Sequence, residues 1–130
     1  MRSKIDFGVV QSIARELFAA HEDPLDETTA YGSPALKIRG KLLACIPVNK
    51  SAEPDSLAVR IDFDRRAELL EAAPDVYYVT DHYADSPMVL VRLSRIQPDA
   101  LRDLLGMARR FVIAAVPAKR ALRKPKPRRA

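Results

Sequence analysis

The chain has 130 residues, 48% of them hydrophobic, which suits one small domain with its own apolar core. Charged residues interrupt every apolar stretch before the roughly 18 to 20 residues that a membrane-spanning helix needs, so we expect no membrane insertion. The single cysteine, Cys45, excludes an intrachain disulfide and a cluster of thiolate metal ligands, and this fits a reducing cytoplasm.

The net charge of +5 is placed unevenly along the chain. Residues 117–130 contain seven cations and no acid: Lys119, Arg120, Arg123, Lys124, Lys126, Arg128 and Arg129. Residues 1–116 hold the other 15 of the 22 cations against all 17 acids, so their net charge is −2. Prolines at 117, 125 and 127 and the dense like charge disfavour a packed structure. We therefore expect one domain over residues 1–116 and a flexible, disordered basic tail over residues 117–130.

The first predicted element is a helix. Apolar side chains recur every three or four positions from Val10 to Phe18, with polar residues on the opposite side. Pro24 interrupts this pattern because proline disfavours helical geometry in the residue before it. We predict an amphipathic helix from residue 6 to about residue 21, followed by a polar loop over residues 24–34.

Three strands are predicted next. Residues 35–38 and 41–46 are compatible with β-structure, and Arg39-Gly40 separates them. A two-residue connection with glycine in second place is typical of a tight hairpin. After a polar loop, residues 57–61 alternate between apolar and polar side chains, which is the period of a strand with one buried face.

The second half of the chain predicts a helix, a hairpin and a closing helix. Asp64 is placed to cap a short helix over residues 65–73. Residues 76–80 and 88–93 are rich in β-branched or aromatic side chains and predict a second hairpin. From Pro98, apolar residues keep helical spacing as far as the tail. Because hairpins favour antiparallel pairing, the predicted class is α+β, an antiparallel sheet with helices packed on one face.

Strand alternation places cations on the face of this sheet that points away from the helices. The positions expected to face the helices are Leu36, Ile38, Leu57, Val59, Ile61, Val89, Val91 and Leu93. The candidate nucleic-acid contacts on the domain are Lys37, Arg39, Lys41, Arg60 and Arg92, joined by Tyr77 or Tyr78. A cationic surface with an aromatic ring is what single-strand binders use to hold phosphates and stack bases. The alternative is a strand surface that long charged side chains merely solvate.

The basic tail has two interpretations as well. Seven cations without an acid would bind phosphates with an affinity that depends on salt and not on sequence. The alternative is a terminus that only improves solubility.

The segment Asp81-His82-Tyr83 is the most chemically mixed part of the chain. Neighbouring side chains on an extended backbone point apart, so Asp81 and His82 are weak evidence for an acid/base pair. The sequence has no nucleophile elbow, no glycine-rich phosphate loop and no metal-ligand spacing. We predict no catalytic residue, no metal and no cofactor, and leave His82 and Tyr83 as candidates for loop recognition. Cys45, among apolar neighbours, is expected in the core.

Three stretches taken in order resemble the MmcQ/YjbR family of small proteins. They are Gly32 to Lys41 (GSPALKIRGK), Tyr78 to Tyr83 (YVTDHY) and Val89 to Leu93 (VLVRL). The resemblance extends from the first helix to about Val116, and it departs at Met107-Ala108-Arg109, where the family often has Ala-Trp-Arg. It implies a CyaY-like α+β fold and a DNA-binding function, and it brings no catalytic residues. Iron binding, which the fold name also suggests, would need an acidic ridge that the first helix lacks.

Two functions from different classes follow. The first is a non-enzymatic DNA- or RNA-binding domain that uses the strand cations and the tail. The second is a protein-interaction or small-ligand module whose recognition surface comes from the loops at residues 29–34 and 81–87. The second function predicts a concave pocket near Tyr83 and no continuous positive face. An enzyme would instead need a deep cleft that brings His82 to a second titratable group.

Overall fold

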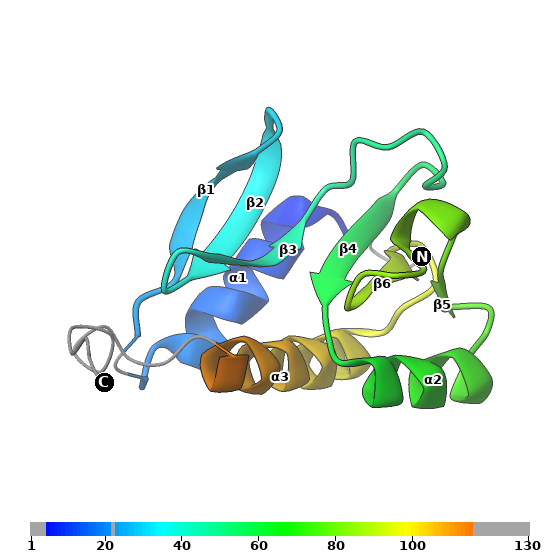
Figure 1. Cartoon of the computed structure of the whole chain (residues 1–130). Coiled ribbons are helices and arrows are strands. Elements are labelled where there is room, and N and C mark those ends of the chain that lie inside the picture. Colours follow the sequence, from blue (N-terminus) through cyan, green and yellow to red (C-terminus); the bar gives the residue numbers. More distant parts are fainter. Residues whose placement is uncertain (1–4, 22, 116–130) are drawn as a thin grey trace, which may run out of the picture.

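The computed structural model describes residues 5–21 and 23–115, and Figure 1 shows how they are arranged. The predicted basic tail lies outside the described residues. The elements in chain order are α1 (Phe7–Phe18), β1 (Asp26–Ala30), β2 (Ser33–Ile38), β3 (Lys41–Cys45), β4 (Ser56–Arg60), α2 (Phe63–Ala72), β5 (Tyr77–Tyr78), the 3₁₀ turn η1 (Asp81–Tyr83), β6 (Met88–Arg92) and α3 (Pro98–Ala115).

The strands of the described part form one antiparallel sheet in the order β1-β2-β3-β4-β6-β5. Helices α1 and α3 lie against one face of this sheet, and α2 contacts its β5–β6 end (Figure 1). This is an α+β fold, and the prediction of an antiparallel sheet with helices on one face is confirmed.

The main core lies between the helices and the sheet. Leu101, Leu104 and Leu105 of α3 are fully buried there, together with apolar residues of every long strand except β1. All eight positions that strand alternation assigned to the helix side belong to this core: Leu36, Ile38, Leu57, Val59, Ile61, Val89, Val91 and Leu93. The alternation of apolar and polar residues along these strands therefore predicted correctly which side chains face the helices.

Aspartates cap the first two helices. The carboxylate of Asp6 accepts a hydrogen bond from the Val9 N–H at 3.1 Å, and that of Asp62 accepts from the Arg65 N–H at 2.6 Å. Each bond satisfies an N–H that has no partner inside its helix. The prediction that Asp64 caps α2 is wrong, since Asp64 lies in the first turn of the helix. A carboxylate there still interacts favourably with the positive end of the helix dipole.

Both tight hairpins use a two-residue turn with positive φ. Arg39 and Gly40, at φ 53° and 76°, join β2 to β3 as predicted. Tyr31 and Gly32, at φ 55° and 81°, join β1 to β2 in the same way. Positive φ at both central residues defines the type I′ turn, whose twist matches that of the strands it connects.

Strand β1 corrects the prediction of a loop over residues 24–34. Its sequence, Asp-Glu-Thr-Thr-Ala, has one apolar residue and therefore lacks the alternation that marks a half-buried strand. It forms an edge of the sheet, where residues paired on one side remain exposed or half-exposed. Pairing with β2 holds it, with Thr28 opposite Ala35.

Candidate binding site on the open face of the sheet

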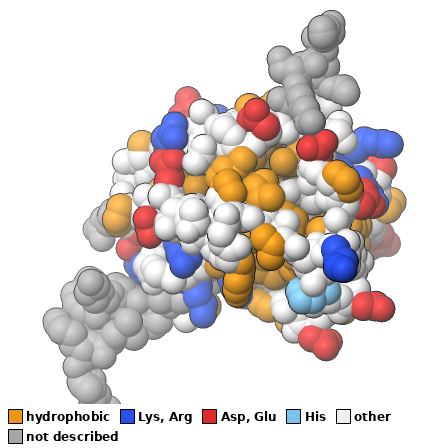
Figure 2. All heavy atoms as spheres, turned by 90° about the horizontal axis from the view of Figure 1, so that it is seen from above, with side chains coloured by type: hydrophobic (Ala, Val, Ile, Leu, Met, Phe, Trp, Pro, Cys, Tyr) orange, Lys and Arg blue, Asp and Glu red, His pale blue; other side chains and the backbone are white. Residues whose placement is uncertain are grey.

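The face of the sheet away from the helices has an apolar centre. Its buried members, which we call the open-face cluster, are Ala35, Cys45, Ala58, Met88 and Leu90. Figure 2 looks onto this side and shows hydrophobic side chains gathered in the middle, with Lys and Arg in separate places around the margin among Asp and Glu. Tyr83 of η1 and Ala52 of the β3–β4 loop pack onto the cluster and cover part of it.

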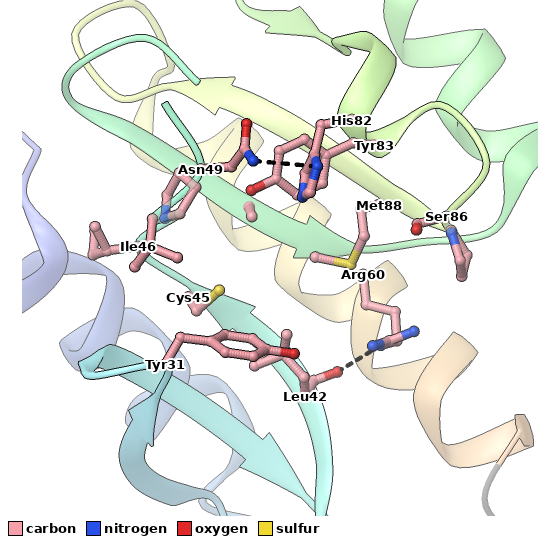
Figure 3. A pocket seen from close by; sticks show the side chains of 14 residues that line it. Tyr31, Leu42, Cys45, Ile46, Asn49, Arg60, His82, Tyr83, Ser86 and Met88 are labelled. Atoms are coloured by element: carbon pink, nitrogen blue, oxygen red, sulfur yellow. Dashed lines mark hydrogen bonds between the residues drawn. The ribbon is translucent and has the colours of Figure 1, made fainter. Parts of the chain in front are cut away.

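A cavity of about 550 Å³ opens on the uncovered part of this face, and we call it the hollow. Its floor consists of Leu42, Cys45, Ala58 and Met88, and its walls consist of Tyr31, residues 46–49, Arg60, residues 82–83 and residues 86–87. Figure 3 shows Arg60 beside Leu42 on one side, His82 with Tyr83 on another, and Met88 between them. Four segments that are separate in the sequence, around Tyr31, residues 42–49, residues 58–60 and residues 82–88, therefore enclose one site.

An irregularity in the pairing of β2 and β3 shapes the floor. Leu36 pairs with Ala44 but Lys37 pairs with Leu42, so Leu43 is an extra residue on β3. Leu43 and Ala44 consequently both join the core on the helix side. Leu42 and Cys45, on either side of them, remain available to line the hollow.

Two side-chain contacts tie the walls of the hollow together. The Asn49 amide nitrogen lies 3.2 Å from His82 Nδ1, and the hydroxyls of Ser51 and Thr80 are 2.8 Å apart. The His82 ring also meets the Tyr83 ring edge-on, with centroids 4.7 Å apart. These contacts connect the β3–β4 loop to η1 and its preceding residue, so the two walls hold each other.

Arg66 of α2 fixes the segment between η1 and β6. Its Nη1 donates to the carbonyls of Ser86 and Met88 at 2.9 and 3.0 Å and to that of Tyr83 at 3.3 Å, and its Nη2 donates to that of Ala84 at 2.9 Å. A guanidinium offers several donors in a fixed plane, which suits it to collect carbonyls from one turn. The sequence did not indicate this role of Arg66, because no local sequence pattern predicts hydrogen bonds to the backbone of a distant turn.

The structure does not bring the five candidate strand cations into one patch. Arg39 pairs with Asp23 at 2.8 Å and donates to the Ile113 carbonyl of α3 at 3.4 Å, which places it on the helix side. Arg92 pairs with Glu53 at 2.8 Å and also contacts two backbone carbonyls. Lys37 is half-exposed and Lys41 exposed on β2 and β3, while Arg60 lines the hollow.

The carboxylates that hold two of these arginines are shifted accordingly. A hydrogen bond from Arg39 lowers the pKa of Asp23, and one from Arg92 lowers the pKa of Glu53. Both acids are therefore stabilised in their charged form beside these cations.

The two tyrosines proposed for base stacking are placed differently. Tyr77 is buried in the core on the helix side, where burial raises the pKa of its phenol. Tyr78 is half-buried on the open face, with the Arg92 guanidinium 4.4 Å from its ring centre. Its hydroxyl lies 2.6 Å from the Ser56 hydroxyl and accepts from the Glu53 N–H at 2.7 Å. The Tyr78 side chain thus connects β5 to Glu53 of the β3–β4 loop and to Ser56 of β4.

Cys45 is buried, as expected. Burial raises the pKa of its thiol, and the positive charge of Arg60 opposes that shift in part. Burial likewise raises the pKa of Tyr83 at the wall. The Cys45 thiol and the Tyr83 phenol are therefore uncharged near pH 7.

Residues 5–21 and 23–115 lack two features that would indicate a metal site or a membrane span. Within these ranges no three His, Cys, Asp or Glu side chains gather closely enough to hold a metal ion. Nor does any helix there have the length and apolar character needed to cross a membrane.

The fold defines the class of this protein as a small α+β domain with an open antiparallel sheet backed by helices. A crystal structure of Deinococcus radiodurans protein DR2400, described as the domain DUF419, is similar to it with a TM-score of 0.60. The two chains are 22% identical, and the similarity covers 82% of this chain and 80% of that one. This likeness shows the fold alone. No family model matches the sequence, and no curated protein matches it.

Proposed function

We propose that this protein is a non-enzymatic ligand-binding module and that the hollow is its binding site. The observation that carries the proposal is the apolar cavity of about 550 Å³ on the open face. Sites for small molecules usually have volumes of about 300 to 1,000 Å³, mostly apolar walls and a few converging polar groups. Here the polar groups at the wall include Asn49, Arg60, His82 and the Tyr83 hydroxyl.

Exposed apolar side chains support the same site. Tyr31 and Val48 are 86% and 56% exposed, the highest values among the large hydrophobic residues of the described part, and both line the hollow. Tyr31 also adopts positive φ, which is uncommon for a bulky residue and costs backbone energy. Exposed apolar side chains that gather around one cavity, rather than lying scattered over the surface, are typical of a binding site.

The contacts between the walls favour binding without rearrangement. Asn49 meets His82, Ser51 meets Thr80, and Arg66 holds the carbonyls that follow η1. A site whose walls are already fixed loses less conformational freedom when a ligand enters.

The chemistry of the wall supports a non-enzymatic role. His82 Nδ1 contacts the Asn49 amide, which does not titrate, and the Cys45 thiol is uncharged near pH 7. A general base or a nucleophile would need a partner that moves or removes its proton.

DNA binding, which the resemblance to the MmcQ/YjbR family implies, is the second function that we carry. The seven cations of residues 117–130 favour it, together with Lys37, Lys41 and Arg60. Arg39 and Arg92 contribute less because carboxylates already hold them. Titration with duplex and single-stranded DNA at two salt concentrations tests this function. We expect binding that weakens with salt and with deletion of residues 117–130; no binding at low salt would contradict it.

Ligand binding is tested by NMR titration of the full chain with three uncharged aromatic probes, indole, 2-naphthol and benzyl alcohol. We expect amide shifts confined to the residues of the hollow. Val48→Asp, at an exposed wall position, should weaken these shifts because it places a charge in the apolar site. Ala20→Asp adds the same charge at an exposed position outside the hollow and should leave them unchanged. Shifts scattered over the surface would contradict the proposal.

A further inference from the structure

We infer that the ligand of the hollow is a small organic acid, with an apolar body on the floor and one carboxylate held by Arg60. The inference rests on the proposed function, because it names the chemical class of the ligand for that same site.

Arg60 differs in its partners from the half-buried arginines that carboxylates hold, and also from Arg66, whose Nη1 and Nη2 groups both donate to backbone carbonyls. Arg39, Arg92 and Arg109 each face a carboxylate, at 2.8, 2.8 and 3.7 Å. Arg60 donates from Nε to the Leu42 carbonyl at 2.9 Å, and its Nη1 and Nη2 have no partner among the described residues. A guanidinium presents parallel N–H groups that match the two oxygens of a carboxylate. The backbone contact therefore orients the group and leaves its bidentate edge for a ligand.

The charge of the lining favours an anion. Among the described residues that line the hollow, none is Asp, Glu or Lys, so Arg60 contributes the fixed charge of the site. Its positive field already acts on Cys45, in the floor. In an apolar environment such a charge interacts more strongly with an opposite charge than it does in water.

The other residues that line the hollow indicate the chemical character of the rest of the ligand. Leu42, Ala58 and Met88 present apolar floor atoms, and the Tyr31 ring lies at the rim (Figure 3). These groups suit an aromatic or aliphatic body. One guanidinium without a second cation in the described lining suits a carboxylate with a single charge better than a phosphate with nearly two.

The test compares three acids with their own primary amides: 3-phenylpropionate, 2-naphthylacetate and octanoate. Each pair keeps the apolar body and removes the charge. Affinities are measured by calorimetry, and NMR shifts locate the site. We expect at least one acid to bind in the hollow about 10- to 100-fold more tightly than its amide, the range for a charge-assisted hydrogen bond.

Variants separate the charge of Arg60 from its place in the fold. Arg60→Gln should reduce the affinity of the acid to that of the amide, while Arg60→Lys should retain part of the difference. Lys41→Gln removes the same charge from an exposed position on the neighbouring strand outside the lining, and it should have no effect. If Arg60→Gln does not fold, the inference is still tested by two measurements. These are the difference in affinity between acid and amide in the unaltered chain, and the same difference in Arg60→Lys.

The outcomes distinguish this inference from the proposed function. Equal binding of acids and amides, with shifts in the hollow, would overturn the organic acid and leave the ligand-binding module standing. Binding of the acids outside the hollow would also overturn it. If neither the acids nor the uncharged probes bind in the hollow, both the inference and the proposed function fail.

Discussion

The two faces of the sheet use the same strands but are covered in different ways. Helices pack against one face, where residues such as Leu57 and Leu104 have no exposed surface. On the other face, a loop and a 3₁₀ turn cover Leu90 but leave Met88 at the floor of a cavity. Helices satisfy most of their backbone groups internally, whereas the loop and the short turn make few backbone hydrogen bonds and are also held by side chains such as Ser51 and Arg66. One face therefore holds the main core, while the other holds the hollow that we propose as a binding site.

The largest expected effect compares a truncation on each face. Leu57→Ala, in the helix-side core, should lower the free energy of unfolding by about 2 to 5 kcal/mol because it leaves an enclosed cavity. Met88→Ala, a buried side chain beside the hollow, should cost less, about 1.5 to 3 kcal/mol, because the space it leaves joins the hollow and the loss is mainly transfer free energy. Urea unfolding of both variants measures the difference. Equal losses would mean that the open-face cluster supports the fold as much as the main core does.

Arg66→Met tests the support of the open face. It keeps the apolar stem of the side chain but removes four hydrogen bonds to backbone carbonyls, so we expect a loss of about 2 to 3 kcal/mol. Amide hydrogen exchange should accelerate in residues 83–88 and change little in α3. The matched control is Arg65→Met on the same helix, whose guanidinium pairs with exposed Glu68 and should matter far less. Uniform acceleration over the domain would show that Arg66 supports both faces alike.

An ion pair on each side of the sheet should make a smaller contribution to the free energy of unfolding, and this contribution depends on pH. Asp23 is 21% exposed beside Arg39 and Arg109 on the helix side, and Glu53 is 49% exposed beside Arg92 on the open side. The folded state lowers the pKa of both acids, so each stabilises the fold above its ordinary carboxyl pKa and loses this contribution as the pH falls below it.

Asp23→Asn should therefore cost about 1 to 2 kcal/mol at pH 7 and less at pH 3, because part of the contribution is lost once the pH falls below the ordinary carboxyl pKa. Glu53→Gln should show the same direction with a smaller amplitude, since water screens the exposed pair. Urea midpoints at pH 7, 5 and 3 measure both. A larger amplitude for Glu53 would reverse the ranking of the two sides.

The smallest expected effect on stability is at the rim of the hollow. Tyr31→Asn should change the free energy of unfolding by no more than about 1 kcal/mol, and in the stabilising direction, because asparagine tolerates positive φ better than tyrosine does. The same variant should weaken binding of the uncharged aromatic probes, because the exposed ring lines the hollow. A thermal melt and an NMR titration measure the two quantities. Lower stability together with unchanged binding would assign Tyr31 a structural role instead.

The helix-side core was predictable from the sequence because a local rule controls it. Alternation in Leu57, Val59 and Val91 identifies the buried phase, and Arg39-Gly40 identifies a turn, without any knowledge of distant residues. Strand β1 escaped prediction because an edge strand needs little burial. Its turn, Tyr31-Gly32, has the same pattern as Arg39-Gly40 and would have indicated it.

The hollow was harder to predict because its walls come from separate segments. The loops at residues 29–34 and 81–87 were candidates for a recognition surface near Tyr83, and both contribute to the walls. Their convergence with the β3–β4 loop depends on sheet order, which no local pattern encodes. One feature of the sequence could have indicated the site. Strands β4 and β6 are apolar at Ala58 and Leu90, which point away from the helices, as well as at the positions that face the helices, and this indicates burial on both faces. Arg60 was identified as a candidate phosphate contact, and its place in an apolar wall changes that interpretation.

The two edges of the sheet bear on how the protein behaves at high concentration. An unpaired edge is a template on which a strand from another molecule can add, and long apolar edges promote aggregation. Here one edge, β5, is two residues long, and the other, β1, begins with Asp26 and Glu27 and continues with two threonines. A short edge and a charged, polar edge are both poor templates for such growth. The polarity that concealed β1 in the sequence therefore protects the sheet from pairing with copies of itself.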